Sequence, residues 1–356
     1  MRGAAGDIFP LDERWQLTPQ ACSPALGGEL VRLSGMLPYE QVSEVCYRWG
    51  GLSIPVTTLW DYVQQAGQRL VEHVMHEREH SRVERTQWHH QDYDPRACKV
   101  VCMDGGMVYV RGEGWKELKA GVIGDVEALP VAPVLSADEQ PHRLQHLRYV
   151  AVVGDATAFS RALWVLAWQH GVPYAGRSAV VSDGASWIWH LAADLFPTSR
   201  QIVDWYHATD HLAQVAAAAY PQDPQAAQHW FRQQSALLYR GEIWKLRQEC
   251  RRAGVEEAHT RYFHTHQRRM QYQAFRAEGF PIGSGSVESG IKQYKARLTG
   301  PGMRWSRAGV ERMVVIRSAV LSGTFDSLWA AARHPAPKSE CTPLWLPGRL
   351  TTLDAS

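Results

Sequence analysis

The fold of this chain is decided by the stretch Lys99-Val100-Val101-Cys102-Met103-Asp104-Gly105-Gly106. Its apolar run predicts a short buried strand, and the Asp-Gly-Gly that follows predicts a tight turn. A second apolar run at residues 107–111 then predicts the return strand of a hairpin. A third strand is predicted over residues 115–126, so the region should begin with three antiparallel strands.

The pattern changes further along the chain. Apolar runs at residues 149–153, 179–181 and 201–203 each end at an aspartate or just before one, and the first two lead into helical patterns. Strands that alternate with helices in this way indicate an α/β fold. From His207 to about Gly279 the strand signals vanish and a long helical region is predicted.

Residues 1–95 also have a helical pattern. Two helices separated by Gly50-Gly51 over residues 39–69 are similar to a helix-turn-helix, whose second helix should begin near Pro55. Helical hairpins with glycine turns are also common in proteins that do not bind DNA. DNA binding by this region is therefore one of two open interpretations.

Composition narrows the class of protein. The chain has 356 residues, 45% hydrophobic and 21% charged, which excludes a disordered or collagen-like chain. It contains no apolar run of about 18 residues and begins without an apolar leader, so we expect a soluble cytoplasmic protein, associated with the nucleoid, with no membrane partner. Six scattered cysteines exclude a disulfide framework.

The net charge of +2 conceals an uneven distribution. Residues 229–318 contain 17 lysines and arginines against 7 acidic residues, so the remainder of the chain is acidic overall. A basic segment of this kind favours binding to phosphate groups, although an ordinary solvated helix face gives similar counts.

Two acids, Asp104 and Asp183, are each predicted to end a strand. Neighbouring strand ends would gather such carboxylates, and their repulsion would require a hard divalent cation, Mg²⁺ or Mn²⁺. Asp155 is a competitor for the second position and Asp125 a lesser one. Aspartates are also common as plain turn residues.

Glu288 is the candidate third ligand. It follows a Gly-Ser loop, in the predicted first turn of a helix, where the helix dipole favours an ionised carboxylate. Lys292 and Lys295 lie on nearly the same helix face and would stand beside a bound phosphate backbone. The alternative is an ordinary Glu–Lys pair on the surface.

Six segments of the chain occur in a characteristic order, namely Met103-Asp104-Gly105-Gly106, Trp115-Lys116-Glu117, Val181-Ser182-Asp183-Gly184-Ala185-Ser186-Trp187-Ile188-Trp189, Asp204-Trp205-Tyr206-His207-Ala208-Thr209-Asp210-His211-Leu212, Gly283-Ser284-Gly285-Ser286-Val287-Glu288-Ser289 and Met303-Arg304-Trp305-Ser306. Together they resemble the landmarks of the bacterial insertion-sequence DDE transposases of the Kra type, which are related to the mutator-like transposases. The resemblance covers most of residues 7–330.

This resemblance implies an RNase H-like catalytic core with an all-helical insertion before the last acid. Asp104, Asp183 and Glu288 match the DDE triad. Asp204 and His207 match the position where relatives have Cys or Asp, two residues, then His. That pair could position the acids or the scissile phosphate, or Asp204 could simply cap a helix while His207 is a buried, hydrogen-bonded side chain.

The expected domains follow from these patterns and from the resemblance. They are a helical DNA-binding domain at residues 1–95, the first part of the core at 96–206, the helical insertion at 207–280, the C-terminal core helices at 281–325, and a poorly packed tail at 326–356.

The implied activity is a polynucleotidyl transfer. Two Mg²⁺ (or Mn²⁺) ions held by the triad would activate water to cut at a transposon end, and the freed 3′-OH would attack target DNA. The expected partners are double-stranded DNA and, in the synaptic complex, a second copy of the chain or a higher oligomer. Phosphates would be held by Lys292, Lys295, Arg297, Arg304 and Arg307.

Three other functions fit the residues to different degrees. The first is an RNase H-like nuclease without strand transfer, which would use the same acids. The second is a domesticated DNA-binding protein that no longer cuts. The third is a zinc hydrolase that uses Asp204, His207 and His211, which has the weakest support because an oxygen-rich site suits Mg²⁺ better.

Overall fold

The structure is a computed structural model that describes residues 22–80, 93–128 and 142–333. The chain forms two compact units. Among the described residues, unit 1 comprises residues 22–80, 107–116 and 293–333, and unit 2 comprises residues 93–106, 117–128 and 142–292.

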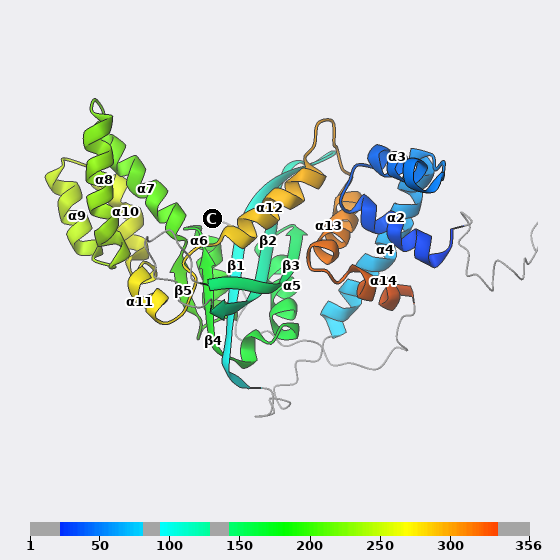
Figure 1. The fold of residues 1–356 in the computed structure, drawn as a ribbon, viewed down its shortest axis with the longest axis horizontal. Coiled ribbons are helices and arrows are strands. Elements are labelled where there is room, and N and C mark those ends of the chain that lie inside the picture. Colours follow the sequence, from blue (N-terminus) through cyan, green and yellow to red (C-terminus); the bar gives the residue numbers. More distant parts are fainter. Residues whose placement is uncertain (1–21, 81–92, 129–141, 334–356) are drawn as a thin grey trace, which may run out of the picture. The chain divides into compact units, whose positions relative to one another are not determined.

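Unit 2 is built on a sheet of five strands with the order β3-β2-β1-β4-β5 among the described residues (Figure 1). β1 pairs with β4 in parallel, as β4 does with β5, whereas β2 and β3 are antiparallel. Only three residues connect β1 to β2, so this pair is a hairpin. The mixed sheet and its helices confirm the α/β class. The strands are β1 (Asp94–Val110), β2 (Gly114–Ala128), β3 (His142–Val153), β4 (Ala175–Ser182) and β5 (Arg200–Val203).

The Asp-Gly-Gly segment at residues 104–106 is not a turn, so that prediction is wrong. β1 runs through it without a break, and the turn comes at residues 111–113, where Gly112 has a φ of 80°. A Cβ atom at Gly105 would lie 3.0 Å from Oε1 of Glu117, the far end of a flexible side chain on the neighbouring strand. A glycine inside a strand and a glycine in a turn look alike in a sequence.

The third antiparallel strand is β3, not the run at residues 115–126, which forms part of β2. Ala120 of β2 pairs with Ala151 of β3 in antiparallel register. The apolar run at residues 149–153 therefore ends the antiparallel part of the sheet instead of opening the parallel part. The error arose because one strand was counted as two at residues 104–106.

Helices cover both faces of the sheet. A Cβ atom at Gly121 of β2 would lie 2.8 Å from Leu163 in α5 (Ala156–Gln169), which packs on one face together with α6 (Ser186–Leu195). On the opposite face, a Cβ atom at Gly290 in α12 (Gly285–Leu298) would lie 2.8 Å from Tyr149 of β3. Figure 1 shows α12 crossing in front of the strands.

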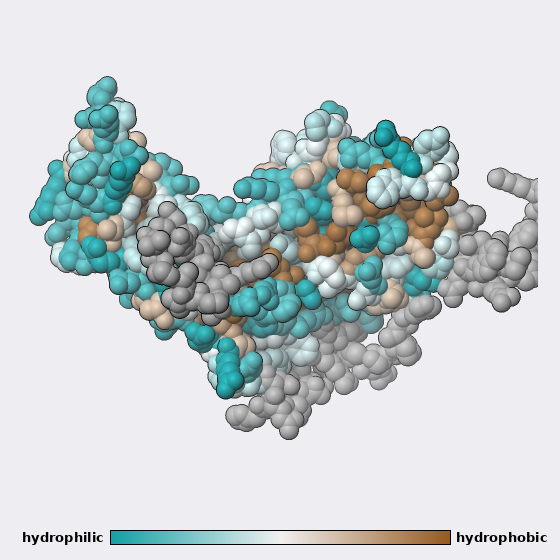
Figure 2. All heavy atoms as spheres, viewed as in Figure 1, coloured by the Kyte–Doolittle hydropathy of each residue, from teal (hydrophilic) through white to brown (hydrophobic). Residues whose placement is uncertain are grey.

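A group of helices separates β5 from α12, in the region predicted to be helical. Its surface is largely hydrophilic in the view of Figure 2. α10 packs against α7, and a short 3₁₀ helix of the same group packs against β5. This helical insertion comprises α7 (Trp205–Ala219), α8 (Pro224–Tyr239), α9 (Ile243–Arg252), α10 (Glu257–His266), η3 (Gln267–Arg269) and α11 (Tyr272–Ala277).

Unit 1 is a helical bundle. Its helices include α2 (Pro24–Ser34), α3 (Tyr39–Gly50), α4 (Val56–His80), α13 (Arg307–Leu321) and α14 (Phe325–Arg333). α3 ends at Gly51 in the left-handed conformation and α4 starts after Pro55, so the predicted helical hairpin is present. None of the described helices is long and apolar enough to cross a bilayer.

The predicted poorly packed tail begins with an ordered helix. α14 contacts α2 and α4, and the indole nitrogen of Trp329 donates to the carbonyl of Pro24 at 3.2 Å. The two aromatic rings of Phe325 and Trp329 stack at 6.1 Å. The proline-rich residues from 334 onward lie outside the described residues.

The close approach of β1 and β4 gives a stability prediction. A Cβ atom at Gly176 would lie 2.3 Å from the carbonyl oxygen of Pro95, which is backbone and cannot rotate away. We predict that Gly176→Ala lowers the free energy of unfolding by about 1–3 kcal/mol. The matched control is Gly154→Ala, because the nearest atom to its Cβ is 3.4 Å away. Equal melting temperatures for the two variants would contradict the prediction.

Candidate active site

Three aspartates stand side by side at the level where β4 and β5 end. Asp183 and Asp204 follow the last residues of these strands, but the prediction that Asp104 ends a strand is wrong, because β1 continues past it to Val110. The last register pairs before them are Val101–Val180 and Ser182–Val203. Continuing these registers brings Asp104 level with Asp183, and Asp183 level with Asp204. Because adjacent strands lie about 4.8 Å apart, the sheet itself gathers the three acids at one edge.

Asp104 has a half-buried carboxyl group whose charged form is disfavoured. Burial raises its pKa to about 6. The Gly105 amide donates a hydrogen bond of 2.6 Å to Oδ1, which lowers the pKa but does not offset the effect of burial. The charges of Asp183 and Glu288 raise this pKa further, while His207 lowers it. Mutual repulsion of carboxylates has this effect when no cation compensates them.

Asp183 follows β4 directly and precedes α6. Its Oδ1 accepts a hydrogen bond from the Ala185 amide at 2.9 Å, which fixes the turn between strand and helix. The carboxylate makes no other hydrogen bond within the part of the chain that the structure describes. One of its oxygens is therefore held by the turn, and the other remains available as a ligand.

Asp204 is fully buried and caps the first turn of α7. Its Oδ1 accepts from the His207 amide at 2.9 Å, and its Oδ2 accepts from the Ser284 hydroxyl at 2.8 Å and from the Ser284 amide. Burial alone would raise the pKa of Asp204, but these bonds and the His207 side chain outweigh it and lower the pKa. Asp204 therefore stays ionised.

Glu288 lies in the first turn of α12, as predicted. Its Oε1 is 3.4 Å from the Ser284 hydroxyl and 3.7 Å from Nδ1 of His207. Asp204, His207 and Glu288 each present one ligand atom, and these atoms all lie within 4.8 Å of one another. Ser284 thus links the buried aspartate to the glutamate.

His207 is the cation that the protein places among these acids. Its Nδ1 is 3.3 Å from Oδ1 of Asp204, and this hydrogen bond raises the pKa of His207 to about 9 against the effect of burial. The charges of Asp204, Glu288 and Asp183 raise it further. His207 is therefore an imidazolium at neutral pH.

The donor set fits a hard divalent cation. Among the described residues, the side chains close enough together to share a metal ion are Asp204, His207 and Glu288. Of the predicted ligands this group contains Glu288 but not Asp104 or Asp183, although the charges of Asp183 and Glu288 act on Asp104. Carboxylate oxygens are the donors that Mg²⁺ and Mn²⁺ prefer. A protonated histidine cannot ligate a metal, so coordination by His207 would require loss of its proton.

The competing acids have other partners. Asp155 caps α5, because its Oδ1 accepts from the Ala158 amide at 2.7 Å. Asp125 forms an ion pair with Lys99 and contacts His146. Neither needs a metal to explain its position.

The zinc alternative loses one of its expected ligands. His211 stacks on the ring of Tyr262 with centroids 3.8 Å apart, and Glu288 takes its place in the group that could hold a metal. The group that remains is oxygen-rich, with one nitrogen donor.

The predicted phosphate-binding residues divide into two groups. Lys292, Lys295 and Arg304 are exposed. Arg297 is only 1% exposed, donates to the Ser34 carbonyl at 2.6 Å and lies over two aromatic rings. The role predicted for Arg297 is thus corrected to a structural one within unit 1, because a buried guanidinium cannot reach a DNA backbone.

Arg307 is also engaged within unit 1. Its Nε donates to Oε1 of Glu113 at 2.9 Å. A second contact joins the same two side chains, so the pair is bidentate. Contact with a phosphate would have to compete with this pair.

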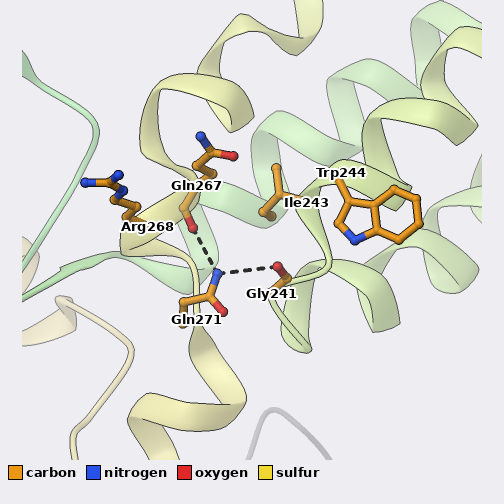
Figure 3. Close-up of a pocket in the computed structure, with 6 residues that line it drawn as sticks. All are labelled: Gly241, Ile243, Trp244, Gln267, Arg268 and Gln271. Carbon is orange, nitrogen blue, oxygen red and sulfur yellow. Dashed lines mark hydrogen bonds between the residues drawn. The ribbon is translucent and has the colours of Figure 1, made fainter.

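A separate hollow of about 460 Å³ lies in the helical insertion (Figure 3). The Gln271 amide bridges the carbonyls of Gly241 at 3.4 Å and Gln267 at 3.0 Å, and Trp244 and Arg268 lie at opposite sides of the view. No carboxylate lines it. The hollow therefore does not compete with the acids as a site for metal-dependent chemistry.

No protein-family model matches this chain, and no curated protein matches it.

Sequence reasoning missed two residues at the site. Ser284 joins Asp204 to Glu288, but serine in a Gly-Ser loop looks like an ordinary loop residue. Tyr262 packs on Gly184, next to Asp183, from a helix far along the chain. The only sequence signal for it was Gly184, which indicates a close approach without revealing its partner.

The His207–Asp204 pair gives a pH prediction for the metal-free protein. In NMR titrations, His207 should titrate at about 9, and in Asp204→Asn its pKa should fall towards the ordinary value, because the acceptor charge is lost. The stabilisation from this pair is complete below the ordinary histidine pKa and disappears as the pH rises through about 9. An unchanged His207 titration in the variant would contradict the assignment.

Proposed function

We propose that this protein is a DNA transposase of the DDE type, which cuts at transposon ends and joins them to target DNA with Mg²⁺ or Mn²⁺. The observation that carries the proposal is that acids from distant parts of the sequence converge. The strand register brings Asp104 level with Asp183, and Glu288 lies 3.7 Å from His207 and close to Asp204. The spacing and order of Asp104, Asp183 and Glu288 in the chain match the triad of the family that the sequence resembles.

We also propose that unit 2 is an RNase H-like core. Three antiparallel strands followed by two parallel ones support this interpretation. The helical insertion between β5 and α12, just before Glu288, is a second supporting feature. Both features agree with the architecture that the family resemblance implies.

In this proposal the protein supplies charge and geometry. Two divalent ions, when bound by Asp104, Asp183 and Glu288, would provide the Lewis acidity for cutting and joining phosphodiesters. Asp204 holds Ser284 and keeps His207 protonated. In this proposal the His207 imidazolium, about 41% exposed, would bind a phosphate oxygen beside Glu288.

The exposed cations support DNA binding. Lys292 and Lys295 lie on α12, the helix that carries Glu288, and Arg304 follows it. Contacts of this type with phosphates are independent of DNA sequence and weaken as salt rises. Recognition of the transposon ends would fall to the helical hairpin of α3 and α4.

Cleavage should require both the metal and Asp183. With DNA that carries the flanks of the protein's own gene, we predict cuts in Mg²⁺ or Mn²⁺ and none with a chelator. Asp183→Asn should lower the cleavage rate by more than about 100-fold while most DNA binding remains, since even outer-shell partners of metal sites cost 10–100-fold.

The matched control for this variant is Asp194→Asn. Asp194 is an exposed residue of α6, the helix that follows Asp183, so the same change in charge occurs outside the acid cluster. Its cleavage rate should equal that of the unaltered protein. Survival of cleavage in Asp183→Asn would show that the triad is wrong.

Joining distinguishes the transposase from its alternatives. With pre-cut ends and a supercoiled target plasmid, we predict covalent joining of the 3′ ends to the target, detected as labelled plasmid. Cutting without joining would indicate a nuclease. Binding to the ends with neither reaction, in either metal, would indicate a domesticated DNA-binding protein.

A further inference from the structure

Tyr262 of α10 reaches from the helical insertion to the residue that follows Asp183. A Cβ atom at Gly184 would lie 2.4 Å from Cε2 of Tyr262 and 3.3 Å from its Cζ. Only glycine therefore allows the ring to lie against this part of the backbone. On its other side the ring stacks on His211, with centroids 3.8 Å apart.

The hydroxyl group of Tyr262 is buried and has no hydrogen-bond partner among the described residues. Buried polar groups in proteins are nearly always paired, so an unpaired one requires an explanation. Burial, followed by the charges of Asp183 and Asp204, raises the pKa of this hydroxyl above its ordinary value. The hydroxyl thus keeps its proton and lies within the field of two carboxylates.

His266, one turn further along α10, approaches the same residue. It is only 6% exposed, and its Nε2 lies 3.3 Å from the position of a Cβ atom at Gly184. Its Nδ1 lies 3.3 Å from Nη1 of Arg269. Because a guanidinium can only donate, Nδ1 is the acceptor and the ring proton is on Nε2.

The orientation and charge of His266 are fixed by its surroundings. Arg269 is held by Gln201 of β5 at 2.8 Å and lies over the ring of Trp189 at 4.6 Å. Burial, together with the charge of Arg269, lowers the pKa of His266 to about 4. At neutral pH the ring is therefore neutral, and its N–H is directed at the loop that carries Asp183.

We propose that α10 positions the second acid of the triad, with the Tyr262 hydroxyl and the His266 Nε2–H donating to the Asp183 carboxylate through one bridging water. Asp183 has one oxygen held by the Ala185 amide and needs a second constraint to present the other to a metal. Donors that orient a ligating carboxylate act in this way at metal sites. This inference rests on the function proposed above, in which Asp183 is a metal ligand.

The proposal assigns a task to the helical insertion. α10 follows α7, α8 and α9 in the chain, and yet its side chains lie against the backbone beside Asp183. A purely structural contact would need the ring of Tyr262 but not its hydroxyl. The hydroxyl and the tautomer of His266 are therefore the features to test.

The test measures binding of Mn²⁺ to the purified full-length chain by electron paramagnetic resonance, without DNA. Tyr262→Phe keeps the ring and removes only the donor, so Mn²⁺ affinity should fall about 10–100-fold while the melting temperature stays close to that of the unaltered protein. The control is Tyr272→Phe, which removes another buried, unpaired hydroxyl from the same insertion. It should leave Mn²⁺ affinity unchanged.

Variants of His266 test the second donor. His266→Gln places an amide N–H near the position of Nε2 and should retain most of the Mn²⁺ affinity. His266→Leu removes the donor and should lose about 10–100-fold. In addition, ¹⁵N shifts of the unaltered protein should show the neutral tautomer with the proton on Nε2, and the other tautomer would overturn this part of the proposal.

The Mn²⁺ affinity of Asp183→Asn, measured in parallel, distinguishes the proposed metal site from the proposed positioning role of Tyr262 and His266. If Asp183→Asn weakens Mn²⁺ binding but Tyr262→Phe and His266→Leu do not, the positioning role is overturned and the proposed metal site stands. If Asp183→Asn also binds Mn²⁺ as the unaltered protein does, both are overturned. Weakening in all three variants, with Tyr272→Phe unaffected, supports both.

Discussion

The gathering of carboxylates where β4 and β5 end beside Asp104 of β1 is the constraint on which this site depends. The parallel registers bring Asp104, Asp183 and Asp204 to one edge of the sheet, and α12 adds Glu288. The pKa of Asp104 rises to about 6, mainly because the carboxyl group is partly buried and to a smaller extent because Asp183 and Glu288 repel its charge. A protein that keeps such a cluster must supply compensating positive charge, and hard divalent cations are the partners suited to oxygen donors.

The protein relieves part of this repulsion with its own groups, and it does so unevenly. Asp204 is fully buried, yet hydrogen bonds from Ser284 and His207 keep it ionised. His207 in turn holds a proton because Asp204 lies beside it. The direct hydrogen bonds that Asp104 and Asp183 accept from described residues come from backbone amides. Asp204 thus has a structural role. Asp104 and Asp183 accept fewer hydrogen bonds, and in the proposed function they remain available to bind a metal.

Much of the architecture was accessible from local sequence. Apolar runs located β4 and β5, and the Gly-Ser loop before Glu288 located the start of α12, because each depends on residues close together in the chain. The hairpin was misplaced, since the glycines at 105 and 106 were interpreted as a turn. Gly105 instead lies within β1, beside Glu117 of the neighbouring strand, and a contact across strands leaves no mark on local sequence.

The sequence by itself determined the α/β class, the identity of the acids and the helical character of the insertion, because strand and helix periods and residue chemistry are local properties. Tertiary structure alone decided which acid is satisfied and which is not, that Arg297 is buried, and that Tyr262 meets Gly184. These outcomes depend on burial and on which distant side chains come into contact. Both are set by packing, which joins residues that the chain holds far apart.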